Sequence, residues 1–161
     1  MKTIIIGLGN PILGDDGVGW KVAEELRKKL PSPIQGEGSG MGVMIETASL
    51  GGLSLMERLE GYQRAILVDS METGGNPVGS VRVFPLSELP NPSDSHSASA
   101  HDTSLLTALE TGRKMGLDLP EKITVVAIEA KTVHDFSEEL SPAVEEAVPG
   151  AVQTVLDLLK R

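Results

Sequence analysis

Apolar residues in this chain follow two spacings that alternate along the sequence. Runs of aliphatic and β-branched residues, or strict polar–apolar alternation, predict five strands at residues 3–6, 43–47, 64–70, 80–84 and 123–128. Apolar positions three or four residues apart predict helices at residues 17–30, 53–59, 103–115 and 141–160. This alternation predicts an α/β fold: a single-domain three-layer α/β/α sandwich over residues 1–161, whose central sheet is mainly parallel or mixed. The order of the strands is not readable from the sequence.

Proline and glycine mark where these elements end. Pro31 ends the first helix, and the glycine-rich residues 36–40 predict a loop that is among the most mobile segments. Pro149 and Gly150 fall inside the last helical pattern, where we expect them to kink or split the helix.

The amino-acid composition excludes several kinds of partner and catalytic site. Aromatic residues make up 2% of the chain against 40% hydrophobic residues in total, so the core must be aliphatic. A net charge of −9 repels phosphate backbones and argues against a nucleic-acid partner. The chain has no cysteine, which excludes disulfides, thiolate metal sites and a cysteine nucleophile. The N-terminal apolar run is too short for a signal peptide, and no run approaches the ~18 residues of a membrane span, so we predict a cytoplasmic protein without a membrane partner.

The loop from Gly7 to Asp16 follows the first strand and should line a site, because ligands of open α/β sheets bind beyond the carboxyl ends of the strands. A dinucleotide-binding loop is not expected: Ile12 stands where its third glycine belongs, and two carboxylates would repel a pyrophosphate. The alternative is structural, with glycines that only form turns and with Asp15 or Asp16 only capping the next helix.

Three polar residues fall where such a site could form. Asp16 follows the first strand, Asp69 ends the third, and His101 stands at the entry of the third helix. Two carboxylates and an imidazole suit a divalent first-row metal with open positions, or a general acid and base pair. The structural alternative is that Asp69 caps a turn and that His101 or Asp102 caps the helix. Hydrolase signatures such as H-E-x-x-H and G-x-S-x-G are absent.

The opening loop closely resembles the motif G-x-G-N-x-[LI]-L-x-D-[DE]-G-x-G of the nickel-iron hydrogenase maturation endopeptidases, matched here by residues 7–19. The resemblance continues over nearly the whole chain. Its further matches are Gly51 with Leu55, residues 66–69, His101 with Leu105, residues 128–129 and residues 140–144.

This resemblance implies a cytoplasmic protease that removes the C-terminal extension of a hydrogenase large-subunit precursor after nickel insertion. Asp16, Asp69 and His101 would then be the catalytic and metal-contacting residues. The metal would be the nickel carried by the substrate, so no permanently bound cofactor is expected. Position 16 holds the shorter of the two acids that the family uses, and Thr47 and Ala48 stand where glycines are common, which affects ligand geometry and docking rather than the reaction.

Two other interpretations remain open. Residues 7–11 also resemble the opening of bacterial peptidyl-tRNA hydrolases, although this chain lacks their Thr-Arg-His-Asn run and their basic surface. A non-catalytic chaperone for nickel or for the precursor could use the same three residues. In a protease or a chaperone that recognises nickel, we expect Asp16, Asp69 and His101 to converge on one solvent-accessible cleft. Asp15 should instead serve the helix terminus.

Overall fold

The computed structural model describes residues 1–30, 42–89 and 100–161, and for residues 100–104 only the backbone is described. The predicted mobile residues 36–40, and His96, lie outside the described residues. Four helices and five strands correspond to the predicted elements within a few residues at each end. The strands are β1 (Thr3–Leu8), β2 (Val43–Ala48), β3 (Arg64–Met71), β4 (Val81–Pro85) and β5 (Lys122–Glu129), and the helices are α1 (Val18–Lys29), α2 (Gly52–Leu59), α3 (Ala100–Lys114) and α4 (Pro142–Leu159). Two short 3₁₀ turns complete the chain: η1 (Gly14–Gly17) and η2 (Leu86–Glu88).

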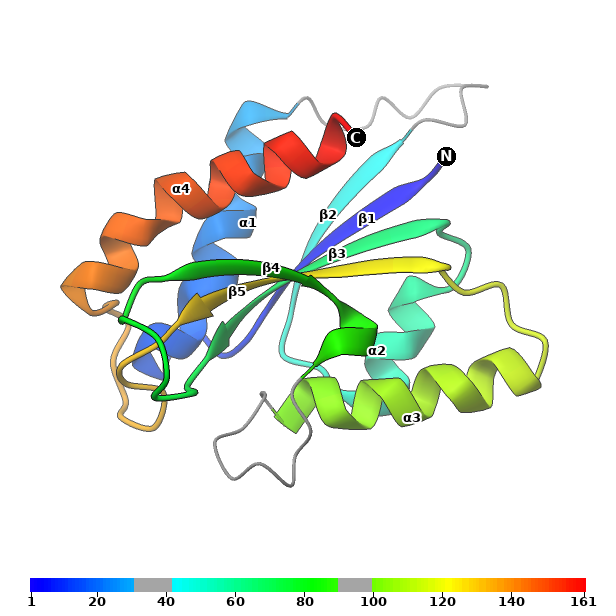
Figure 1. The fold of residues 1–161 in the computed structure, drawn as a ribbon, viewed down its shortest axis with the longest axis horizontal. Helices are drawn as coiled ribbons and strands as arrows, with labels where there is room; N and C mark the ends of the chain where they lie inside the picture. Colours follow the sequence, from blue (N-terminus) through cyan, green and yellow to red (C-terminus); the bar gives the residue numbers. More distant parts are fainter. Residues whose placement is uncertain (31–41, 90–99) are drawn as a thin grey trace.

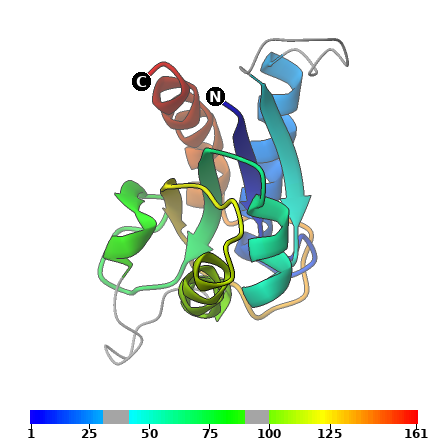
Figure 2. The ribbon, with the colours of Figure 1, turned by 90° about the vertical axis from the view of Figure 1, so that its right-hand side faces the viewer.

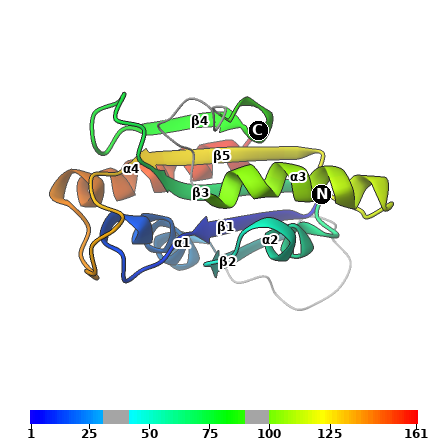
Figure 3. The same ribbon diagram turned by 90° about the horizontal axis from the view of Figure 1, so that it is seen from below.

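The five strands form one sheet in the order β2-β1-β3-β5-β4, which Figure 3 shows from below. The first four strands in this order are parallel, and β4 pairs with β5 in the antiparallel direction at one edge. The predicted sandwich with a mainly parallel sheet is therefore confirmed.

Helices cover both faces of the sheet, with α1 and α4 on one side and α2 and α3 on the other (Figures 1 and 2). β1 shows why the strands read as unbroken apolar runs. Ile4 and Ile6 pack with α2 and α3, whereas Ile5 between them packs with α1 and α4. Because both faces of the central strands are covered, alternation of polar and apolar residues is lost there.

Close packing of α1 on the sheet depends on a glycine. A side chain at Gly19 would bring its Cβ within 2.4 Å of the carbonyl oxygens of Leu8 and Val68. The missing Cβ therefore lets the start of α1 lie directly against the ends of β1 and β3, which brings η1 and its two aspartates over the edge of the sheet.

The sequence predicts a kink or a split of the last helix at Pro149 and Gly150. A split is wrong, because α4 runs unbroken through Pro149, whereas a kink stays a prediction. Pro149 lies on the exposed side of the helix, where water can satisfy the carbonyl of Glu145 that loses its helical donor. Val144 before the proline and Val152 after it are both buried against the same face of the sheet. Burial on both sides holds the two halves together. No helix in the described part of the chain is long and apolar enough to cross a membrane.

Candidate active site

The candidate site lies at the carboxyl edge of the sheet. Here β1 runs into the loop that carries Asp16, and β3 ends just after Asp69. α3, whose second residue is His101, starts after the long connection that leaves β4. The sheet topology thus brings together segments that are more than 30 residues apart in the sequence.

Two hydrogen bonds hold the Asp16 carboxylate. The Asn10 backbone N–H donates to Oδ2 at 2.8 Å, and the Ser70 hydroxyl donates to Oδ1 at 3.0 Å. Gly9 makes this position possible: its φ is +129°, and a Cβ there would lie 1.9 Å from the Asp16 carbonyl oxygen. The glycine-rich loop therefore fixes Asp16 over the end of β3.

Asp69 lies in β3 directly before Ser70 and is fully buried. Its Oδ1 accepts the backbone N–H of Ser70 at 2.9 Å. Side chains alternate along a strand, so Asp69 projects to the same face as Leu67 and Met71, toward α2 and α3. Ser70 projects to the other face and donates its hydroxyl to Asp16. The two carboxylates therefore approach the sheet edge from opposite faces, and each accepts a hydrogen bond from Ser70.

The expected solvent-accessible cleft is only partly supported. Asp16 is half-buried, but Asp69 has 0% exposure, so the predicted solvent accessibility is wrong for Asp69. Burial follows from its place inside a central strand rather than in the loop beyond it. Neither carboxylate lines the larger cavities among the described residues, of about 360 to 670 Å³. A cavity of about 200 Å³ adjoins the opening loop at Gly14 and Gly17, but it too is not lined by Asp16 or Asp69.

His101 is placed by its backbone, on the face of the sheet that also carries Asp69. Its side chain lies outside the described residues, so convergence of all three side chains stays a prediction. Within the described side chains, no group of three His, Asp or Glu residues is positioned to hold a metal ion.

Asp15 has a structural role that differs from the predicted one. No side chain caps η1 or α1; instead the buried Asp15 carboxylate accepts four hydrogen bonds from a distant loop. The donors are the backbone N–H groups of Lys131 (2.9 Å), Thr132 (3.0 Å) and Ser141 (2.6 Å) and the Ser141 hydroxyl (2.8 Å). Asp15 thus ties the opening loop to the residue before α4.

The electrostatics of Asp15 follow from these bonds. Burial by itself raises the pKa of the carboxyl, but the hydrogen bonds from Ser141, Thr132 and Lys131 outweigh it and hold the pKa below its ordinary value. Asp15 is therefore an ionised anchor for the loop, and the helix terminus that it serves is that of α4.

Three further residues at this edge were not predicted to take part. Ser70 links the two carboxylates, as described above. Glu129, at the end of β5, is buried and accepts the Thr73 N–H at 3.1 Å as well as the Thr73 hydroxyl. Arg82 of β4 pairs with Ala127, the same residue with which Asp69 pairs from the other side. A strand-end carboxylate after an apolar run, the signal that singled out Asp69, would also have found Glu129.

Comparisons with known proteins agree with this architecture. A family model described as hydrogenase maturation protease matches residues 20–158. The chain is 24% identical to the hydrogenase 2 maturation protease of Escherichia coli, over 99% of this chain and 92% of that protein. It is 29% identical to the delta subunit of coenzyme F420 hydrogenase from Methanothermobacter thermautotrophicus, over 97% and 93% of the two chains.

Solved structures show the same fold. The hydrogenase maturating endopeptidase HybD from E. coli superposes with a TM-score of 0.80 at 24% identity, covering 99% of this chain and 93% of that one. The [NiFe] hydrogenase maturation protease HybD from Thermococcus kodakarensis superposes with a TM-score of 0.65 at 25% identity, covering 99% of both chains. The predicted endopeptidase family is confirmed. This chain belongs to the hydrogenase maturation protease family.

Proposed function

We propose that this protein removes the C-terminal extension of a nickel-iron hydrogenase large-subunit precursor after nickel has been inserted. The substrate's nickel would be recognised by Asp16, Asp69 and His101. The observation that carries the proposal is the position of Ser70. Its hydroxyl donates a hydrogen bond to Asp16, and its neighbour in β3 is Asp69. Family membership makes the reaction peptide-bond hydrolysis.

The donor chemistry supports metal recognition. Among the described residues, each Asp16 oxygen accepts one hydrogen bond, from Asn10 or from Ser70, whereas an ionised carboxylate offers about four lone-pair sites. Asp16 therefore keeps capacity to bind a cation. Oxygen ligands with an imidazole nitrogen suit a divalent first-row metal and leave coordination positions for the substrate's own ligands.

The same carboxylates can serve the hydrolysis. A carboxylate beside the scissile bond can take a proton from the attacking water, as a general base. Asp16 is the better placed for this role, since it is half-buried in a loop whereas Asp69 is enclosed in its strand. A permanently bound cofactor is not required, because the metal arrives with the substrate. Cytoplasmic location stays a prediction.

The test is processing of the matching precursor, followed by gel mobility, with nickel-loaded and nickel-free substrate. We expect the wild-type protein to shorten only the loaded precursor. Asp16→Ala and His101→Ala should abolish the shift, and Asp69→Asn is the better variant at the buried position because it keeps the side-chain volume. His134→Ala is the matched control, since His134 is exposed in a loop, and it should retain activity.

Three results would overturn the proposal. Equal cleavage of nickel-free precursor would refute metal recognition, and full activity of the His101 variant would refute the role of that residue. Circular dichroism of each variant separates lost activity from lost fold. Tight binding of the loaded precursor without any cleavage would support a chaperone instead.

A further inference from the structure

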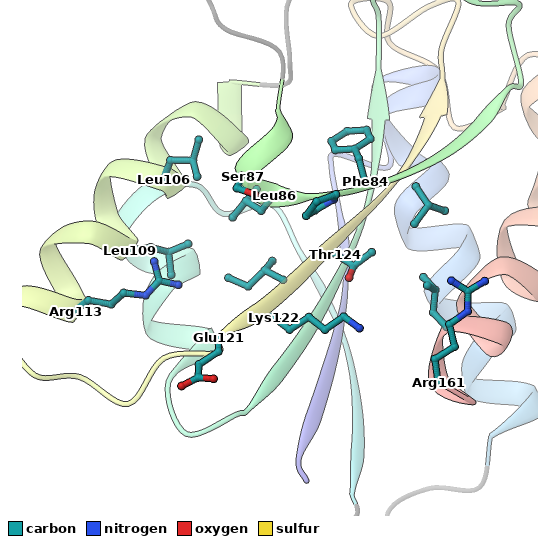
Figure 4. A pocket seen from close by; sticks show the side chains of 14 residues that line it. Phe84, Leu86, Ser87, Leu106, Leu109, Arg113, Glu121, Lys122, Thr124 and Arg161 are labelled. Atoms are coloured by element: carbon teal, nitrogen blue, oxygen red, sulfur yellow. The ribbon is translucent and has the colours of Figure 1, made fainter.

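A cavity of about 670 Å³ opens at the β4 edge of the sheet, and neither Asp16 nor Asp69 lines it (Figure 4). We call it the edge notch. It is defined by Phe84, Leu106, Arg113, Lys122, Thr124 and Arg161. It lies toward the amino end of β5, whereas Asp16 and Asp69 lie at the carboxyl ends of β1 and β3.

The edge notch lies where the pairing between β4 and β5 ends. β4 pairs with β5 only from Ile128 back to Thr124, and then leaves the sheet at Pro85. Lys122 and Ile123 continue β5 without a strand on that side in the described part of the chain. Ile123 is buried and Lys122 is exposed. Successive residues of a strand direct their backbone groups to alternate sides, so one of these two residues can offer its N–H and C=O to an extended chain laid along the edge.

Positive charge gathers around this open edge. Figure 4 shows Arg113 coming from α3, Lys122 from β5, and Arg161 from beyond the end of α4. None of these three cations forms an ion pair with another described residue, and Glu121 is the one acidic residue of the lining. The lining of the edge notch is therefore positively charged, although the chain as a whole has a net charge of −9.

The lining of the edge notch also includes apolar side chains, and a hydrogen bond holds one of its cations in place. The Arg113 guanidinium donates to the Pro120 carbonyl at 3.2 Å, which holds it beside the opening. Leu106 and Val83 line the cavity with 36% and 45% of their surfaces exposed. Basic residues in the last turn of a helix interact favourably with the helix dipole. This interaction explains the position of Arg113 at the end of α3 but not that of Lys122, which lies in a strand.

We propose that the edge notch docks an extended, carboxylate-bearing segment of the hydrogenase large-subunit precursor. This proposal rests on the proposed function. The open strand edge favours an extended chain, the three cations favour carboxylates, and the apolar side chains can take the residues between them. β5 spans eight residues from Lys122 to Glu129, roughly 23 Å at ~3.3 Å per residue, so one extended segment of the precursor can reach from the notch to the active-site edge.

The test measures binding separately from cleavage. The full chain carrying Asp16→Ala, which we expect to be inactive, is titrated with the nickel-loaded precursor. A triple variant in this background replaces Arg113, Lys122 and Arg161 by glutamine. The matched control replaces three exposed lysines of α1, Lys21, Lys28 and Lys29, by glutamine. Its net charge therefore changes by the same amount as that of the notch variant.

We expect the notch variant to raise Kd at least about tenfold and to flatten its salt dependence, while the control changes Kd by less than about twofold. Equal effects of the two variants would mean general electrostatics and would overturn the proposal, as would an unchanged Kd in the notch variant. A shift of the Ile123 amide resonance by inorganic phosphate, without one by the precursor, would assign a small-anion site and also overturn it. Failure of the wild-type protein to cleave would refute the proposed function alone.

Discussion

Replacing Asp15 by asparagine should destabilise the fold without removing a metal-contacting group. Asp15 Oδ2 accepts three hydrogen bonds, from Lys131, Thr132 and the Ser141 hydroxyl, and Oδ1 accepts the Ser141 N–H. Asparagine offers one acceptor oxygen, so its NH₂ group must face at least one donor. A hydrogen bond to a charged group contributes about 1.5–3 kcal/mol, and an unpaired buried donor costs about 1–3 kcal/mol. We therefore expect a loss of about 3 kcal/mol in the free energy of unfolding.

Urea unfolding followed by circular dichroism at pH 7 measures this loss. Asp135→Asn is the control, because Asp135 is exposed in the same loop and its replacement should change the free energy by less than about 0.5 kcal/mol. An Asp15→Asn midpoint equal to that of the wild type would refute the anchoring role.

The effect should depend on pH with a definite sign. The Asp15 pKa lies below its ordinary value of 3.8, so the stabilisation is present above that value and is lost as the pH falls through the lowered pKa. The stability difference between wild type and Asp15→Asn should stay constant near neutrality and shrink in acid below about pH 4. A difference that is the same at pH 7 and at pH 3 would contradict the hydrogen-bonded, ionised state.

Three further changes test the local geometry. Gly9→Ala should cost about 3 kcal/mol or more in urea unfolding, because its φ is +129° and its Cβ would meet the Asp16 carbonyl; an unchanged midpoint would refute the close approach. Gly150→Ala should raise the free energy of unfolding by about 0.5–1 kcal/mol, since the position is exposed within α4 and has open space; a lower Tm would contradict this. Ser70→Ala should leave the fold intact but reduce kcat/KM for precursor processing at least about fivefold, because Asp16 loses a donor of about 1 kcal/mol; full activity would show that Ser70 does not position Asp16.

The sequence by itself determined the fold class and the order of elements. Unbroken or alternating apolar runs predict the strands, and apolar residues three or four positions apart predict the helices. Both patterns are local, because each element needs only its own residues to show them. The opening motif also identified the family, because the match spans both glycines and acids in one continuous stretch. Its glycines now have a physical reason at Gly9 and Gly19, where a Cβ would collide with neighbouring backbone.

The tertiary structure alone decided the order of the strands, the continuity of α4 and the partners of the two adjacent aspartates. The opening motif assigned Asp16 to the site and Asp15 to a helix terminus, but it did not show their partners: Asp15 meets donors at residues 131–141, whereas Asp16 meets Ser70. Pro149 would split an isolated helix, but burial of Val144 and Val152 against one sheet face keeps α4 whole. These outcomes depend on which distant groups come within hydrogen-bond or packing distance, and such contacts form only once the chain is folded.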